Sequence, residues 1–144
     1  MAQQGYIELD TIAYAGVRLI EQGKRLNAIS LNWQKSKNEV ITLTSYEAWS
    51  YAINGTEYHA KDIEINGKEA RFFLERMASG NLTLYFIQNK GKHFFIEKDS
   101  TLSELFKRDA SGKKHCPLHL FWKNFLYVNI GERYEYLVID LDEL

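Results

Sequence analysis

The chain has 144 residues and a net charge of −1, from 18 Lys and Arg against 19 Asp and Glu. This balance provides no overall positive field to hold a polyanion, which argues against nucleic-acid binding. No apolar run approaches the roughly 20 residues that a membrane-spanning helix needs, so we expect no transmembrane segment. Aromatic residues make up 14% of the chain, and because they favour pleated and recognition surfaces they indicate a β fold with a binding role.

The first third of the chain consists of short segments rich in β-branched and aromatic residues, separated by polar turns. Residues 13–20 fit either a strand or a short helix, and residues 21–24 are typical of a turn. Trp49, Tyr51 and Ile53 recur at period two, which places them on one face of a strand. The strands expected in this part are 5–10, 28–33, 39–44 and 46–53.

Two Ile-Asn-Gly tripeptides, 53–55 and 65–67, flank the strand-length segment 56–64. Asn-Gly supplies the positive φ angles of a tight type I′ turn, because Gly lacks a Cβ atom and Asn tolerates the left-handed region. Two such turns around one segment predict consecutive antiparallel strands. The centre of the chain is therefore expected to be a β-meander.

The meander continues through three further predicted strands, 69–77, 82–87 and 92–97. Residues 82–87 are apolar on both faces. Such a strand is either covered on both sides or exposes one side to a ligand or partner.

A short helix is predicted at about residues 101–108. Thr101 and Glu104 match the S/T-x-x-E capping box, in which each side chain satisfies a free backbone N–H at a helix start. Leu102, Leu105 and Phe106 then supply an apolar stripe at helical spacing.

Two interpretations of the following segment stay open. Pro117 could begin a helix over residues 117–126, since proline suits the first helical position. Alternatively, a strand runs to Asn129, turns at Gly131 and pairs with residues 133–140. Periodicity does not decide between them.

These elements predict a mainly β fold: an antiparallel meander forming a curved sheet or a small barrel or sandwich, with one or two short helices. No linker or repeat divides the sequence. We therefore expect a single β-rich domain over residues 1–144.

Several turn and core patterns support a family resemblance. They are Gly5-Tyr6-Ile7-Glu8-Leu9, Asn54-Gly55-Thr56-Glu57-Tyr58, Arg71-Phe72-Phe73-Leu74, residues 82–86, residues 92–97 and residues 102–106. On these, the stretch from residue 5 to about residue 106 resembles an uncharacterised family of exported proteins from Bacteroidetes-type bacteria. The resemblance implies a periplasmic or cell-surface location. The start Ala2-Gln3-Gln4 fits a signal-peptidase remnant, while the single Cys116 leaves a cytoplasmic location open.

A metal site is the first chemical candidate. His115, Cys116 and His119 are residue types that bind zinc, and the two histidines would share a face if the segment were helical. Pro117 interrupts such a helix, and no second Cys/His pair follows at ligand spacing. The alternative is a loop with exposed histidines and a buried thiol. No cofactor is expected.

Carboxylates are the second candidate. Asp62 and Glu64, or Glu64 and Glu69, could mimic the carboxylate pair of a glycosidase, or simply form the exposed face of a strand. The sequence contains no Gly-rich phosphate loop, G-x-S-x-G elbow or H-E-x-x-H motif. This favours a binding protein over an enzyme.

Aromatic residues are the remaining candidates for ligand binding: Trp49, Tyr51, Tyr58, Tyr134 and Tyr136. Aromatic faces suit sugar rings, apolar ligands or protein side chains, although core packing would explain each residue singly. The leading hypothesis is a non-enzymatic binding or protein-interaction module of the bacterial cell envelope, with an unknown protein, small-molecule or glycan ligand. Alternatives are a lipocalin-like barrel for a small apolar ligand and a small metal-dependent hydrolase.

Overall fold

The computed structural model describes residues 2–9, 12–79, 82–105, 107–108, 110–111, 114–115, 121–122, 125–129 and 136–140. It is mainly β, with a single short helix among these residues. The chain divides into two compact units, Met1–Glu75 and Arg76–Leu144, and each is considered by itself. The single domain expected from the sequence stays a prediction.

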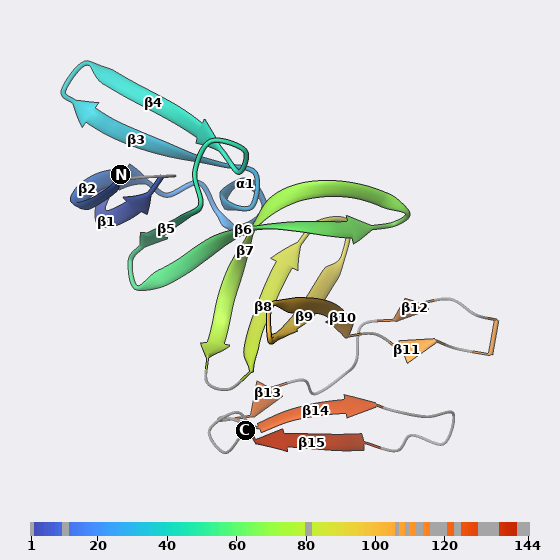
Figure 1. Ribbon diagram of the computed structural model, residues 1–144. Helices are drawn as coiled ribbons and strands as arrows, with labels where there is room; N and C mark the ends of the chain where they lie inside the picture. Colours follow the sequence, from blue (N-terminus) through green and yellow to red (C-terminus); the bar gives the residue numbers. More distant parts are fainter. Residues whose placement is uncertain are drawn as a thin grey trace. The chain divides into compact units, whose positions relative to one another are not determined.

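Ten strands belong to one antiparallel sheet, in the order β10-β9-β8-β7-β6-β5-β1-β2-β3-β4 (Figure 1). Strands β5 to β10 follow one another in chain order, which confirms the predicted meander. The strands are β1 (Ala2–Glu8), β2 (Ala13–Ile20), β3 (Ser30–Ser36), β4 (Glu39–Thr44), β5 (Ser50–Ile53), β6 (Thr56–Ile65), β7 (Lys68–Ser79), β8 (Thr83–Gln88), β9 (Lys92–Lys98) and β10 (Thr101–Leu105).

Both Asn-Gly turns form as predicted. Asn54 and Gly55 have φ angles of 52° and 79°, and Asn66 and Gly67 have φ angles of 53° and 78°. Positive φ at both central residues is the mark of a type I′ turn, whose twist matches that of the flanking strands. The turns fix the register of the β5–β6 and β6–β7 hairpins, which continues without a bulge.

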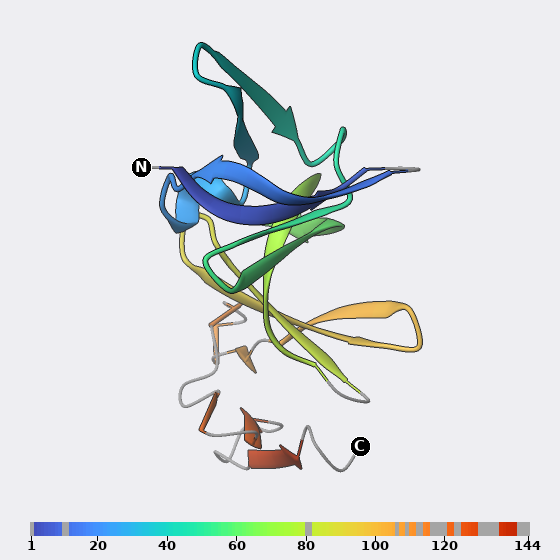
Figure 2. The same ribbon diagram turned by 90° about the vertical axis from the view of Figure 1, so that its left-hand side faces the viewer.

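The core of the first unit lies between its strands and helix α1 (Lys24–Asn27), which occupies the end of the predicted turn. Residues 13–20 are strand β2, which runs beside β1 as a long curved pair (Figure 2). The register shifts between Gly5 and Tyr6, and β1 also pairs with β5. The buried cluster consists of Ile7, Val17, Leu19, Leu31, Ala48, Tyr51, Ile53, Tyr58, Ala60 and Phe73.

One face of the β6–β7 hairpin is buried and mainly aromatic near β5 and charged further along. Near β5 this face carries Tyr58, Ala60 and Phe73, which are buried in the core. Further along, the same face carries the opposed pairs Asp62–Arg71 and Glu64–Glu69. Because opposed residues in an antiparallel pair share a face, the aromatic core surface continues directly into a charged one.

The predicted helix at 101–108 is wrong over its described residues. Residues 101–105 are strand β10, in which Thr101 lies opposite Lys98 of β9, and residues 107–108 form β11 (Lys107–Arg108). Asp99 and Ser100 both have positive φ, 49° and 65°. They reverse the chain in a tight turn immediately before Thr101, so the capping-box residues enter a hairpin instead of a helix.

For the last segment the strand interpretation is correct. Strand β14 (Phe125–Asn129) pairs with β13 (Phe121–Trp122) and with β15 (Tyr136–Asp140), while β12 (Lys114–His115) pairs with β11. The alternative helix over 117–126 is therefore wrong for residues 121–122 and 125–126. The pairing of β14 with β13 and β15 decides this, and local periodicity does not report which strands pair.

Candidate functional site

Two of the predicted ligand-binding aromatics lie in the core. Tyr51 and Tyr58 are 2% and 5% exposed. Their rings stack with centroids 4.8 Å apart and an interplanar angle of 12°, and Phe73 meets Tyr51 edge-on at 4.9 Å. Such geometry suits aromatic packing inside a protein. These two side chains hold the first unit together and present no surface to a ligand.

The buried tyrosine hydroxyls are satisfied by Asn27, the last residue of α1. Tyr51 Oη donates a hydrogen bond to the Asn27 carbonyl oxygen at 2.5 Å. Asn27 Nδ2 donates to Tyr58 Oη at 3.2 Å and to Glu21 Oε1 at 2.5 Å. Burial raises the pKa of both tyrosines above their ordinary value, most strongly for Tyr51. Both stay neutral at physiological pH and tie α1 to the sheet.

The exposed aromatics lie on the connection between β4 and β5. Tyr46 is 72% exposed and Trp49 is 55% exposed. The backbone of Trp49 is held on both sides, since its N–H donates to Glu8 O at 2.8 Å and its carbonyl accepts from Ala60 N at 2.7 Å. Tyr134 lies outside the described residues, and Tyr136 is described only as the first residue of β15. Of the predicted aromatics, Trp49 is the one that the structure places on the surface.

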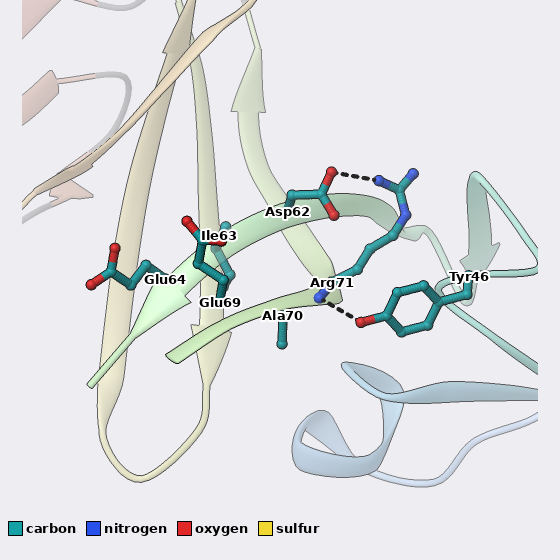
Figure 3. A pocket seen from close by; sticks show the side chains of 7 residues that line it. All are labelled: Tyr46, Asp62, Ile63, Glu64, Glu69, Ala70 and Arg71. Atoms are coloured by element: carbon teal, nitrogen blue, oxygen red, sulfur yellow. Dashed lines mark hydrogen bonds and ion pairs between the residues drawn. The ribbon is translucent and has the colours of Figure 1, made fainter. Parts of the chain in front are cut away.

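An open hollow of about 460 Å³ lies on the charged part of the β6–β7 hairpin (Figure 3). Tyr46 reaches it from the β4–β5 connection and the other lining residues come from the two strands. The sequence singled out its carboxylates but not Tyr46, which it placed at the start of the predicted strand 46–53. That strand begins only at Ser50, and Tyr46 lies in the turn before it. The lining residues are Tyr46, Asp62, Ile63, Glu64, Glu69, Ala70 and Arg71.

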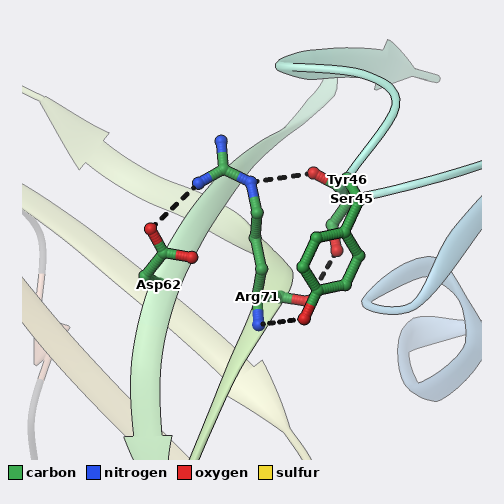
Figure 4. Close-up of polar contacts among 4 residues, drawn as sticks. All are labelled: Ser45, Tyr46, Asp62 and Arg71. Atoms are coloured by element: carbon green, nitrogen blue, oxygen red, sulfur yellow. Dashed lines mark hydrogen bonds and ion pairs between the residues drawn. The ribbon is translucent and has the colours of Figure 1, made fainter.

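Arg71 makes three contacts that hold the Tyr46 loop against β7, and a fourth with Asp62 on β6 (Figure 4). Its backbone N–H donates to Tyr46 Oη at 3.2 Å, and its Nε donates to Ser45 O at 2.8 Å. Its Nη1 pairs with Asp62 Oδ2 at 3.2 Å, and its carbonyl accepts from Ser45 Oγ at 2.5 Å. A phenol ring that is mostly exposed is thus held in position at the edge of the hollow.

The hollow is negatively charged overall. Asp62, Glu64 and Glu69 contribute three carboxylates against the single guanidinium of Arg71, which Asp62 already neutralises. Glu64 and Glu69 lie directly opposite each other on exposed parts of the strands. Like charges in this position repel, and a cation between them would relieve the repulsion.

The predicted metal site lies almost wholly outside the described residues. The backbone of His115 belongs to β12, while Cys116 and His119 are not described. Among the side chains that are described, no group of three His, Cys, Asp or Glu residues could hold a metal ion. The zinc hypothesis stays a prediction. None of the described helices is long and apolar enough to cross a membrane.

No family model, curated protein or solved structure matches this chain. The fold and the site therefore define its class by themselves. It is an antiparallel β protein with an open, negatively charged hollow that the exposed ring of Tyr46 lines at one edge.

Proposed function

We propose that the protein is a non-enzymatic interaction module that binds a partner protein at the hollow on the β6–β7 hairpin. The observation that carries this proposal is Tyr46, an aromatic ring that is 72% exposed yet fixed at the edge of the hollow by its bond from Arg71. Aromatic residues dominate the binding energy of protein interfaces. A ring that is already in position loses little entropy on binding, so its contact contributes more to affinity.

The charge of the hollow supports a partner that presents a lysine or arginine side chain. Glu64 and Glu69 supply carboxylates that can accept the paired hydrogen bonds of a guanidinium. The Tyr46 ring supplies a face on which a cation is attracted by the ring quadrupole. A volume of about 460 Å³ lies in the usual range for ligand sites and is ample for one long side chain.

The proposed location is the bacterial cell envelope. It is supported by the resemblance of residues 5–106 to exported proteins. Fractionation of the source bacterium, with an antibody to the protein, tests it. A signal in the periplasmic or surface fraction is expected, and recovery with the cytoplasmic marker would exclude it.

No observation on the described residues specifically favours either alternative function, the lipocalin-like barrel or the metal-dependent hydrolase. A lipocalin-like barrel needs an apolar cavity, whereas the interior of the first unit is filled by side chains such as Tyr51 and Phe73. The hollow itself is lined mostly by charged groups. The metal-dependent hydrolase rests on His115, Cys116 and His119, and metal analysis of the purified protein tests it.

Binding of a charged probe and its neutral isostere tests the proposed function. The probes are acetyl-Gly-Arg-Gly-amide and the same peptide with citrulline, which keeps the shape of arginine without its charge. We expect the arginine peptide to shift the NMR amide signals of residues 62–71 and of Tyr46 in a saturable way. The citrulline peptide should leave them unchanged.

Charge-neutralising variants locate the site. Glu64→Gln combined with Glu69→Gln should weaken binding of the arginine peptide at least tenfold, because it removes the two carboxylates without changing their size. Glu39→Gln, at an exposed carboxylate on β4, is the matched control and should bind as the wild type does. Equal responses to arginine and citrulline, or no saturable response to either, would refute the proposal.

A further inference from the structure

The charged side chains of the hollow form two successive cross-strand pairs on one face of the β6–β7 hairpin (Figure 3). Asp62 lies opposite Arg71, and Glu64 lies opposite Glu69, two residues further along the hairpin. Residues two positions apart in an antiparallel strand are separated by about 6.8 Å. Tyr46 Oη accepts a hydrogen bond from the Arg71 N–H at 3.2 Å, which places the phenol beside the Asp62–Arg71 pair.

The two pairs differ in charge. In the first, Asp62 Oδ2 lies 3.2 Å from Arg71 Nη1, so the two charges compensate each other. In the second, Glu64 and Glu69 are both acidic and both exposed. The Glu64–Glu69 pair is therefore the place for a cationic side chain, and the Asp62–Arg71 pair suits a group without net charge.

The Asp62–Arg71 pair and the adjoining phenol are suited to an aromatic ring. Arg71 donates through Nε to Ser45 O at 2.8 Å and through Nη1 to Asp62, and both bonds leave from the edge of the guanidinium plane (Figure 4). The flat face of a guanidinium held by its edge can stack on an aromatic ring. The exposed ring of Tyr46 adds a second aromatic contact, stacked or edge-on.

The connection that carries Tyr46 is also held by bonds of its own. Glu47 Oε1 accepts hydrogen bonds from Thr44 N at 3.0 Å and from Thr44 Oγ1 at 3.1 Å. Thr44 Oγ1 in turn accepts from the Tyr46 N–H at 3.3 Å. The phenol therefore stands beside the guanidinium before any ligand arrives, and such preorganisation lowers the entropic cost of binding.

We propose that the hollow binds an extended peptide segment in which an arginine and an aromatic residue stand two positions apart. This recognition sequence rests on the proposed function, whose partner it specifies. Side chains at positions i and i+2 of an extended chain point to the same side and are about 6.8 Å apart, which matches the spacing of the two pairs. The arginine guanidinium, a planar fork of N–H donors, pairs with Glu64 and Glu69. The aromatic ring contacts Tyr46 and the guanidinium of Arg71.

Peptides that differ in the spacing of the two side chains test this recognition sequence. Acetyl-Arg-Gly-Phe-amide and acetyl-Phe-Gly-Arg-amide carry the spaced pair in the two directions that an extended chain can take. NMR titration of the amide signals of residues 62–71 gives the dissociation constants. One of the two peptides should bind at least tenfold more tightly than acetyl-Arg-Gly-Ala-amide, which lacks the ring. It should exceed acetyl-Arg-Phe-Gly-amide equally, because adjacent side chains of an extended chain point to opposite sides.

Two variants that remove an exposed ring locate the aromatic contact. Tyr46→Ala should bind the spaced peptide no more tightly than acetyl-Arg-Gly-Ala-amide. Trp49→Ala is the matched control, because Trp49 is exposed but does not line the hollow, and it should keep the tenfold preference. Circular dichroism confirms that both variants are folded.

The outcomes separate this recognition sequence from the proposed function. If the arginine peptides bind but neither spaced peptide exceeds the alanine peptide, the aromatic contact is refuted and the binding of a cationic partner stands. A preference that survives in Tyr46→Ala refutes the aromatic contact as well. If no arginine peptide binds, the proposed function fails and the recognition sequence fails with it.

Discussion

At the scale of single residues, Asn27 joins helix α1 to the two buried tyrosines of the first unit. Its side chain is 2% exposed, and its backbone and amide serve the hydroxyls of Tyr51 and Tyr58. A buried polar group that loses its partner retains the full cost of its removal from water. The stability of the aromatic core therefore depends on one amide from a four-residue helix.

Replacement of Asn27 by alanine should therefore be costly. Asn27→Ala removes the amide that donates to Tyr58 and leaves a small void, and we expect the free energy of unfolding to fall by about 2–3 kcal/mol. Urea denaturation followed by tyrosine fluorescence measures it. Asn32→Ala, which removes an exposed bond to Thr42, is the control, with an expected change within about 0.5 kcal/mol. Equal losses in both variants would contradict the role assigned to Asn27.

The same two tyrosines make the fold sensitive to alkali. Burial raises the folded pKa of Tyr51 and Tyr58 above the ordinary value of 10.0. The unfolded chain then loses protons that the folded chain keeps. Stability is complete below about pH 10 and falls at higher pH, by about 1.4 kcal/mol per pH unit from the strongly shifted Tyr51, with a further loss from Tyr58.

Denaturation at pH 9, 10 and 11 measures this loss. Tyr51→Phe should show a shallower decline above pH 10, because it has no hydroxyl to ionise in the unfolded state. Tyr46→Phe, at an exposed ring, should decline as steeply as the wild type. Identical slopes in all three proteins would show that the buried hydroxyls do not control alkaline unfolding.

At the scale of elements, the junction of β1 with β5 depends on a single glycine. Gly5 lies opposite Ile53, and a Cβ atom built there would stand 1.9 Å from the carbonyl oxygen of Ala52. Real Cβ atoms do not approach backbone oxygen so closely. Any side chain at position 5 must therefore push the two strands apart.

Gly5→Ala should cost about 3 kcal/mol or more, since it disrupts both packing and strand hydrogen bonds. Gly67→Ala is a useful comparison, because its Cβ would meet open space and only the positive φ of 78° opposes it. That strain is worth about 1–2 kcal/mol. Thermal unfolding of the two variants gives the order, and a smaller loss at Gly5 would contradict the close approach of β1 and β5.

The sequence predicted those elements that local chemistry controls. Asn54-Gly55 and Asn66-Gly67 carry their turn geometry with them, so the meander could be inferred without tertiary information. The capping box at Thr101 failed because four residues can satisfy it in any context, and the turn at Asp99 and Ser100 already directed the chain into a hairpin. Local motifs are decisive only when no competing turn adjoins them.

The candidate site was harder to foresee because it depends on contacts between distant residues. The alternation of residues in β6 places Tyr58 and Asp62 on the same strand face. It does not predict that Tyr58 is buried under α1 while Asp62 lines a hollow. Tyr46 reaches that hollow through bonds to Arg71, 25 residues further along the chain. Sequence periodicity predicts which residues share a face of a strand, but it does not predict which other elements cover that face.

At the scale of the whole molecule, the core of the first unit and the candidate site are built on one hairpin. Tyr58, Ala60 and Phe73 are buried near β5, and further along the same face Asp62 and Arg71 line the hollow. The position of the hollow therefore depends on the packing of the aromatic core.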